Sequence, residues 1–254
     1  MKIALTHVVS PSISRCELTY LAREPIDFEK AVHQHSAYCS SLERAGARVI
    51  ELTENSGHPD GCFVEDNAVV VEEVAVIASM GAASRRGEVE AVERVLSEYR
   101  PISRIEAPGS LEGGDVIVAG KRVFAGVSPR TNIAGIEELS TILKRHSYEV
   151  SATSMRDCLH LKSACTFIGD NTLLANPQWV DLRQFDGFRL LEIAESEAWA
   201  ANALRFGQTV FMGSQFPESA EIVRHAGFDV ELIDISELIK AEAGLTCSSI
   251  IFDA

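Results

Sequence analysis

The chain has 254 residues, of which 46% are hydrophobic and 24% charged, a balance that suits a folded protein with a full core and excludes a disordered chain. Its 23 Lys and Arg residues against 37 Asp and Glu leave a formal charge of −14, which disfavours nucleic acid and anionic membrane surfaces as partners. No segment approaches the ~20 apolar residues of a membrane span, and residues 1–14 are too short and too mixed for a signal peptide.

The cysteines are scattered and contain no CxxC pair, so they resemble neither a disulfide framework nor a zinc site. This usage favours a reduced, cytoplasmic setting. The six positions are Cys16, Cys39, Cys62, Cys158, Cys165 and Cys247.

The first predicted helix covers roughly residues 28–45, with Asp27 as its N-cap and Gly46 after its last turn. Two short apolar strands follow at 68–71 and 74–79, then a helical pattern with Val89, Val92, Val95 and Leu96 on one face, and a strand at 102–106. The same order recurs along the chain. Its later segments are strands at 116–118 and 123–127, a helix bearing Ile136, Leu139, Ile142 and Leu143, strands at 165–168 and 172–175, a helix at 219–225, and a strand at 248–252.

Polar residues open each of these repeating units at a nearly constant spacing. They are Glu65, Asp115, His160, Asn202 and Cys247, and the intervals are 50, 45, 42 and 45 residues. A period of this length is typical of an array of equivalent supersecondary units, and five such units closing on themselves form a propeller-like ring. The sequence therefore predicts an α/β protein of five ββαβ modules with pseudo-fivefold symmetry, in which the fifth module takes its helix from the N-terminus. An ordinary α/β sandwich with coincidental spacing is the alternative. No linker-like stretch interrupts the chain, so residues 1–254 are predicted to form a single domain.

A ring would bring Cys247 and His160 to one central axis. A thiolate nucleophile needs a nearby proton acceptor or positive charge, and later an acid for the leaving group, and a histidine serves both needs. Either Glu112 or Asp115 could orient that imidazole as the third member of a triad. A cysteine before a terminal strand can equally be a small buried hydrophobe.

Acidic residues gather in an apolar stretch at Asp60, Glu65 and Asp66, with Glu112 one unit later. Uncompensated carboxylates are costly there, so a bound cation is expected. A guanidinium suits best because its planar fork pairs with carboxylates, and a divalent metal is the rival interpretation.

Arg85 and Arg130 occupy corresponding loops of adjacent units. Two arginines at one rim could bind a carboxylate, although arginines in such loops are often only solvated.

Several stretches together resemble the dimethylarginine dimethylaminohydrolases of the pentein superfamily, in order and over nearly the whole chain. They are residues 59–66 (PDGCFVED), 81–86 (GAASRR), 111–115 (LEGGD), 130–132 (RTN), 159–163 (LHLKS) and 245–247 (LTC). The resemblance implies a pentein fold of five ββαβ modules with the active site in the central channel, which agrees with the repeat.

The resemblance also implies roles for individual residues. Cys247 would be the nucleophile, His160 the general acid and base, and Glu112 its partner. Substrate contacts would come from the carboxylates that hold the guanidinium and the α-amino group, the arginines that hold the α-carboxylate, an apolar side chain and the main chain of one loop. These positions are Glu65, Asp66, Asp60, Arg85, Arg130, Phe63 and Leu18.

By the same resemblance, the reaction is hydrolysis of an N-methylated arginine to citrulline and a methylamine, with no cofactor or metal. The expected partner is a small guanidino amino acid, with a homodimer as the assembly to test. A catalytically silent pentein-like binding protein would keep the ring without needing the three catalytic residues together.

The segment at residues 14–19 departs from the family pattern. Family members usually carry a glycine just before the leucine at position 18, whereas this chain has Glu17 there and Arg15 nearby. Charges in a loop that covers the site could change which amine is accepted, so arginine or another guanidino or ureido amino acid is the runner-up substrate.

Overall fold

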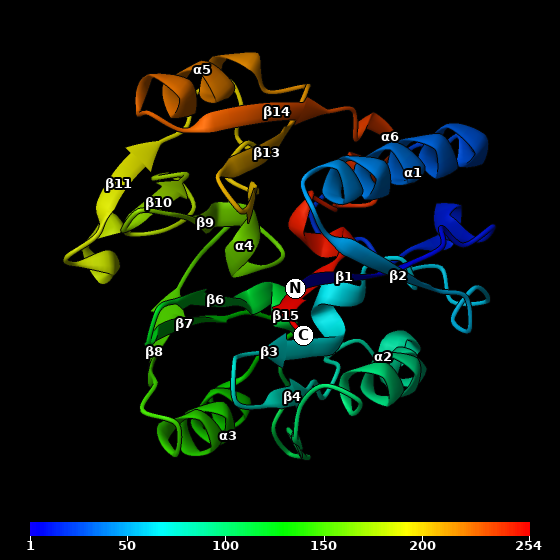
Figure 1. Ribbon diagram of the computed structural model, residues 1–254, viewed down its shortest axis with the longest axis vertical. Coiled ribbons are helices and arrows are strands. Elements are labelled where there is room, and N and C mark those ends of the chain that lie inside the picture. The colour runs from blue at the N-terminus through cyan, green and yellow to red at the C-terminus, as the bar shows by residue number, and fades with distance from the viewer.

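The computed structural model describes all of residues 1–254 as five three-stranded sheets arranged around a centre (Figure 1). In every sheet the middle strand runs antiparallel to the first strand and parallel to the third. The sheets, in chain order, are β3 (Ala68–Val70), β4 (Ala75–Ile77) and β5 (Ile102–Arg104); β6 (Val116–Ala119), β7 (Arg122–Val127) and β8 (Glu149–Ser154); β9 (Cys165–Gly169), β10 (Thr172–Ala175) and β11 (Arg189–Glu192); β12 (Leu204–Phe206), β13 (Thr209–Gly213) and β14 (Asp229–Ile233); and β15 (Ile250–Asp253), β1 (Lys2–His7) and β2 (Arg48–Leu52).

A helix connects the two parallel strands in four of the five modules and lies at the outside of the ring in Figure 1. These helices are α2 (Val89–Leu96), α3 (Ile133–Lys144), α5 (Pro217–His225) and α1 (Phe28–Arg44). The third module has only the 3-10 turn Leu182–Phe185 at this place. Two short helices, α4 (Leu161–Ala164) and α6 (Ser236–Ile239), lie outside this scheme. The five-module ββαβ architecture predicted from the repeat is confirmed.

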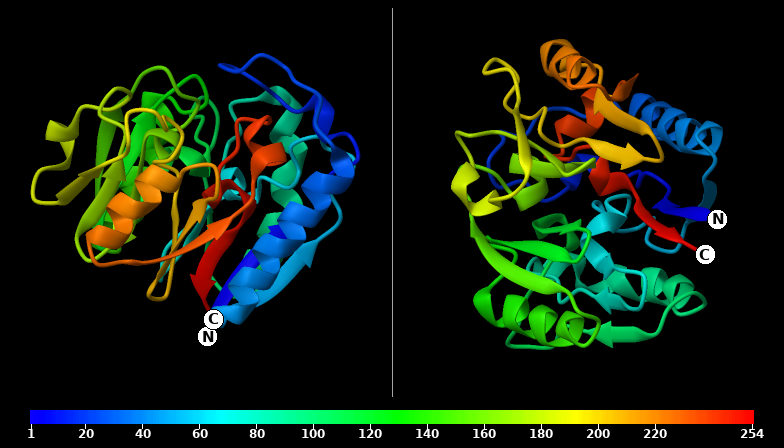
Figure 2. Two further views of the ribbon diagram at one scale, coloured as in Figure 1. Left: turned by 90° about the horizontal axis from the view of Figure 1, so that it is seen from above. Right: turned by 60° about the vertical axis from the view of Figure 1, so that its left-hand side comes forward.

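The fifth module joins the two ends of the chain. β15 pairs antiparallel with β1, with Lys2 opposite Asp253, and the amide of Ala254 donates to the carbonyl of Met1 at 2.8 Å. The termini lie side by side in both views of Figure 2. The N-terminal segment also supplies α1 and β2 of this module. Because β1 pairs with β15, the first and last strands of the chain leave no free edge between them.

Helix α1 shows how local sequence sets the boundaries of these elements. The Asp27 side chain accepts a hydrogen bond from the amide of Lys30 at 3.1 Å and caps the first turn. Ala31, Tyr38 and Leu42 are buried on one face. The helix ends before Gly46, whose φ of +99° is a conformation that glycine adopts without strain.

Each of five apolar clusters is shared by two neighbouring modules. One, for example, combines Ile3 and Leu5 of β1 with Val92 and Leu96 of α2. A module therefore buries its apolar face only against its neighbours, as expected of a repeat architecture. None of the helices could cross a bilayer, since none combines the required length with an apolar stretch.

Candidate active site

The residues that open the modules lie shortly before the first strand of each sheet. One short turn, Thr246–Ser248, carries Cys247 and precedes β15. The side chain of Asn202 holds it: its Oδ1 accepts from the amide of Thr246 at 3.0 Å, and its Nδ2 donates to the Thr246 hydroxyl at 3.0 Å. The turn is thus fixed by the opening residue of the preceding module. The Cys247 Sγ accepts a hydrogen bond from the amide of Gly244 at 3.4 Å.

His160 lies just before α4 and contacts one of the two carboxylates that the sequence left open. Its Nε2 is 2.8 Å from Oε2 of Glu112. The other oxygen of Glu112 accepts from the amides of Gly81 and Ala82 at 3.1 and 3.3 Å. Asp115 instead accepts from the amide of Leu161 at 2.9 Å. Of the two candidates, Glu112 contacts the imidazole and Asp115 binds the main chain beside it. The role of Glu112 as the third member of a triad stays a prediction.

The charges around His160 favour its protonated form. Burial alone would lower its pKa, but the nearby carboxylates of Asp66, Asp115 and Glu112 raise it to about 9. Burial, with Glu65 and Asp66 nearby, raises the pKa of the Cys247 thiol well above its usual value. The resting pair at neutral pH is therefore an imidazolium and a neutral thiol.

A second polar group lies next to this pair and centres on Arg85. Its Nη1 donates to Oδ2 of Asp66 at 2.6 Å, its Nη2 donates to Glu88 at 2.8 Å, and Nη2 also donates to the carbonyl of Phe63 at 3.0 Å. The remaining carboxylate oxygen of Asp66 accepts from the amide of Gly114 at 3.1 Å and lies 3.7 Å from Nδ1 of His160. Arg85 thereby fixes the carboxylate that faces the imidazole.

Arg130 lies near Glu112, and Asp60 binds the loop that contains Glu17. Nη1 of Arg130 is 3.6 Å from Oε1 of Glu112. Burial raises the pKa of Asp60 to about 6, and its two oxygens accept from the amide of Glu17 at 3.2 Å each. The side chain of Glu17 accepts from the Ser84 hydroxyl at 2.5 Å, so this loop bridges two walls of the site.

Seven of the ten predicted site residues line one small cavity. They are Asp60, Phe63, Asp66, Arg85, Arg130, His160 and Cys247. Glu112 lies directly behind His160, and the side chain of Leu18 is half-buried against the apolar cluster of the fifth module. The cavity has five further lining residues, Glu17, Leu159, Ala241, Glu242 and Ala243.

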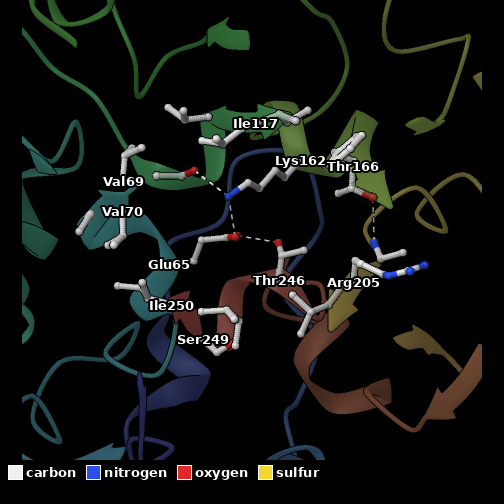
Figure 3. Close-up of a pocket in the computed structure, with 18 residues that line it drawn as sticks. Glu65, Val69, Val70, Ile117, Lys162, Thr166, Arg205, Thr246, Ser249 and Ile250 are labelled. Atoms are coloured by element: carbon white, nitrogen blue, oxygen red, sulfur yellow. Dashed lines mark hydrogen bonds and ion pairs between the residues drawn. The ribbon is translucent and has the colours of Figure 1, made fainter. Parts of the chain in front are cut away.

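Glu65 contacts the Thr246–Ser248 turn on the side that faces away from the Cys247 cavity. Figure 3 shows its carboxylate between Lys162 and Thr246, at 2.7 Å from Nζ and 2.6 Å from the hydroxyl. Together they line a separate cavity of about 240 Å³, whose walls are apolar side chains of β3, β6, β9, β12 and β15. Both Glu65 oxygens are therefore engaged away from the Cys247 cavity, and its direct contact with substrate stays a prediction.

The cluster of Asp66, Glu112 and His160 has the donor chemistry of a metal site, with ligand atoms within 4.8 Å of one another. Those donors are already bonded to one another, to Arg85 and to the amides of Gly81, Ala82 and Gly114. Cations of the protein itself thus compensate the carboxylates.

The comparison with known proteins agrees with this arrangement. A family model described as N,N dimethylarginine dimethylhydrolase, eukaryotic, matches residues 20–183. The chain is 35% identical to an N(G),N(G)-dimethylarginine dimethylaminohydrolase of Pseudomonas aeruginosa over 228 residues, covering 89% of this chain and 90% of the relative. A Streptomyces coelicolor protein of the same name is 33% identical over 250 residues, or 98% and 96% of the two chains. The chain belongs to the dimethylarginine dimethylaminohydrolase family.

Solved structures extend the likeness to the backbone. A cysteine-to-serine mutant of the Pseudomonas aeruginosa enzyme in complex with citrulline superimposes with a TM-score of 0.94 at 32% identity, covering 98% of both chains. The N-terminal domain of an arginine dihydrolase, ArgZ, gives a TM-score of 0.85 at 18% identity, which shows a shared fold. The pentein architecture expected from the family resemblance is confirmed.

Proposed function

We propose that this chain hydrolyses Nω-methylated arginine, as dimethylarginine or monomethylarginine, to citrulline and a methylamine. One observation carries the proposal: Cys247, His160 and side chains of both charges line the same cavity, and His160 is paired with Glu112. The citrulline complex of a family member at a TM-score of 0.94 supports the same product class.

The substrate itself can activate the nucleophile. The Cys247 thiol is neutral because burial and nearby carboxylates raise its pKa. A guanidinium beside it adds a positive charge, which stabilises the thiolate, and the thiol proton then leaves to solvent because His160 is already protonated. The charge of the methylarginine would thus promote ionisation only when substrate is in place.

The reaction then follows a covalent route. The Cys247 thiolate attacks the guanidinium carbon, a C–S bond forms, and the C–N bond to the methylamine breaks as the His160 imidazolium protonates the departing nitrogen. The product on the enzyme is an S-alkyl thiouronium. His160, now neutral, takes a proton from water, which attacks the same carbon. The C–S bond breaks and the remaining proton of the added hydroxyl passes to the departing sulfur, which releases citrulline and regenerates the thiol.

Recognition of the amino-acid end would use both charges of the cavity. Arg85 and Arg130 would bind the α-carboxylate, and Asp60 with the main chain of Leu18 would bind the α-amino group. Asp66 would hold the guanidinium beside Phe63. Arg85 also forms an ion pair with Asp66. Binding of the substrate carboxylate to Arg85 and binding of the substrate guanidinium to Asp66 would therefore affect each other.

Citrulline release from dimethylarginine, monomethylarginine, arginine and agmatine tests this proposal. The methylated amino acids should turn over fastest, and agmatine should be a very poor substrate because it lacks the α-carboxylate. Cys247→Ser should abolish turnover in the same assay. A faster reaction with arginine would assign the runner-up substrate, and turnover by the serine variant would contradict the covalent route.

A thiol mechanism also predicts the pattern of inhibition. Iodoacetamide should abolish activity, and a chelator should leave it unchanged. The opposite pattern would favour a metal at Asp66, Glu112 and His160.

The remaining expectations concern the setting of the enzyme. We infer a single domain over residues 1–254 and a reduced, cytoplasmic environment, which suits six cysteines that are all free thiols. A homodimer is the assembly that sedimentation would check.

A further inference from the structure

One cavity-lining residue, Glu242, has a bonding pattern that the proposed reaction does not use. Its carboxylate accepts from the amide of Thr19 at 2.9 and 3.0 Å and also from the amides of Tyr20 and Leu21. Only 4% of the residue is exposed, and no Lys, Arg or His forms an ion pair with it. Three consecutive main-chain amides, 221 to 223 residues earlier in the chain, therefore hold this buried charge.

The backbone at Glu242 indicates that its side chain has a specific role. Its φ is +57°, a left-handed conformation in which a residue with a Cβ is strained and glycine is not. The charge-assisted bonds to the loop can offset that strain. Glu242 also lies in the segment that leads into the Cys247 turn, so one short stretch carries both the nucleophile and the acceptor for the loop.

The loop is held on two sides of the cavity. Asp60 accepts from the amide of Glu17, and Glu242 accepts from the amides of residues 19–21. The left view of Figure 2 shows the dark-blue segment after β1 at the opposite end of the molecule from the two termini. Residues 17–21 therefore form a strap, anchored by two carboxylates that both line the cavity.

The position of Thr19 gives this anchoring a chemical consequence. Its amide belongs to the same planar peptide group as the carbonyl of Leu18, and in a trans peptide the N–H and the C=O point in opposite directions. Fixing the Thr19 N–H on Glu242 thus fixes the direction of the Leu18 carbonyl, a proposed acceptor for the α-amino group of the substrate.

We propose that Glu242 is a positioning residue that holds the strap closed and aims the Leu18 carbonyl at the substrate ammonium. The inference rests on the proposed function for its ligand, an α-amino acid with a guanidinium. The inference adds that the enzyme selects substrates with an α-amino group. Glu242 brings about this selection although it does not touch the reacting atoms.

The test compares Glu242→Gly with Glu237→Gln on two substrates. Glycine removes the carboxylate and suits the positive φ. Glu237 is a matched control, because it lies in the same C-terminal segment and accepts from the amide of Asp27 at 2.9 Å, beyond the other end of the loop. The substrates are Nω-methyl-L-arginine and its des-amino analogue, 5-(N′-methylguanidino)pentanoate.

Glu242→Gly should lower kcat/KM for methylarginine about tenfold or more, mainly through KM, and change that of the des-amino analogue much less, since one charge-assisted contact is at stake. Glu242→Asp, which keeps the charge and tolerates the backbone, should recover part of the loss. Glu237→Gln should leave the ratio between the two substrates unchanged. An equal loss on both substrates, or no loss on either, would overturn the positioning role.

Hydrogen exchange separates a failure of this inference from a failure of the proposed function. The amides of residues 19–21 should exchange faster in Glu242→Gly than in the wild type or Glu237→Gln, whether or not the enzyme turns over methylarginine. If these amides are equally protected in Glu242→Gly and the wild type, Glu242 does not anchor the strap. Faster exchange in Glu242→Gly than in the wild type, together with a wild type that hydrolyses neither substrate, would support the anchoring of the strap by Glu242 and contradict the proposed function.

Discussion

At the scale of single residues, charge controls the reactivity of Cys247. Because burial and the carboxylates of Glu65 and Asp66 raise its thiol pKa, the thiolate fraction is smaller than for an ordinary cysteine and grows as pH rises. Alkylation of Cys247 by iodoacetamide should therefore keep accelerating through pH 9, without a plateau near pH 7. Asp66→Asn should speed the reaction at fixed pH, and the exposed Asp229→Asn should not. A plateau below pH 8 in the wild type would show a preformed thiolate.

Glu17 offers a second test at this scale. Its amide bonds to Asp60 and its carboxylate to Ser84, which places the residue at the wall of the cavity. Glu17→Gly should change the ratio of dimethylarginine to arginine turnover, because it removes a charged side chain from the lining of the cavity. Glu24→Gly, in the exposed part of the same loop, is the control. An unchanged ratio in citrulline-release assays would leave Glu17 with a structural role only.

At the scale of elements, the turn before β6 shows why the Glu-Gly-Gly-Asp stretch contains glycines. A Cβ on Gly114 would lie 2.6 Å from Oδ1 of Asp66 and 2.7 Å from Nδ1 of His160. Gly114→Ala should therefore displace the imidazole, lower kcat by more than tenfold and destabilise the protein by about 1–3 kcal/mol. Gly57→Ala, where a Cβ meets nothing within 4 Å, should change the free energy of unfolding by less than about 0.5 kcal/mol. Activity assays and urea titrations of both variants measure these effects. Full activity of Gly114→Ala would show that the imidazole is not displaced by a Cβ at this position.

The elements also show how far sequence reasoning reached. Helix α1 begins and ends where Asp27 and Gly46 predict, since caps and turns are local chemistry. The residue pattern alone left Glu112 and Asp115 open, and only the family resemblance indicated Glu112. The two lie three positions apart, and the register of the turn decides which one meets His160. Glu242 was missed for a different reason. Its partners are main-chain amides at the other end of the chain, and an amide leaves no mark in the sequence.

At the scale of the whole molecule, the ring makes distant parts of the chain depend on one another. Each apolar cluster belongs to two modules, and the fifth module requires β15 from the C-terminus and β1 from the N-terminus together. The five openings then meet at the centre, so the Cys247 cavity takes residues from several modules. Partial unfolding of any module would thus remove a wall of the site.

If residues 1–254 are a single domain, the ring should unfold as one unit. The two tryptophans, Trp179 and Trp199, report on the third and fourth modules, where their rings pack at 5.0 Å, whereas far-UV circular dichroism reports on all five. Both signals should follow the same urea transition, with one midpoint and one slope. Deleting residues 250–254, which removes β15 from the fifth module, should abolish the folded tryptophan signal as well, although the tryptophans lie in other modules. A tryptophan transition that survives this deletion would mean that part of the ring folds independently, and would divide the single domain proposed here.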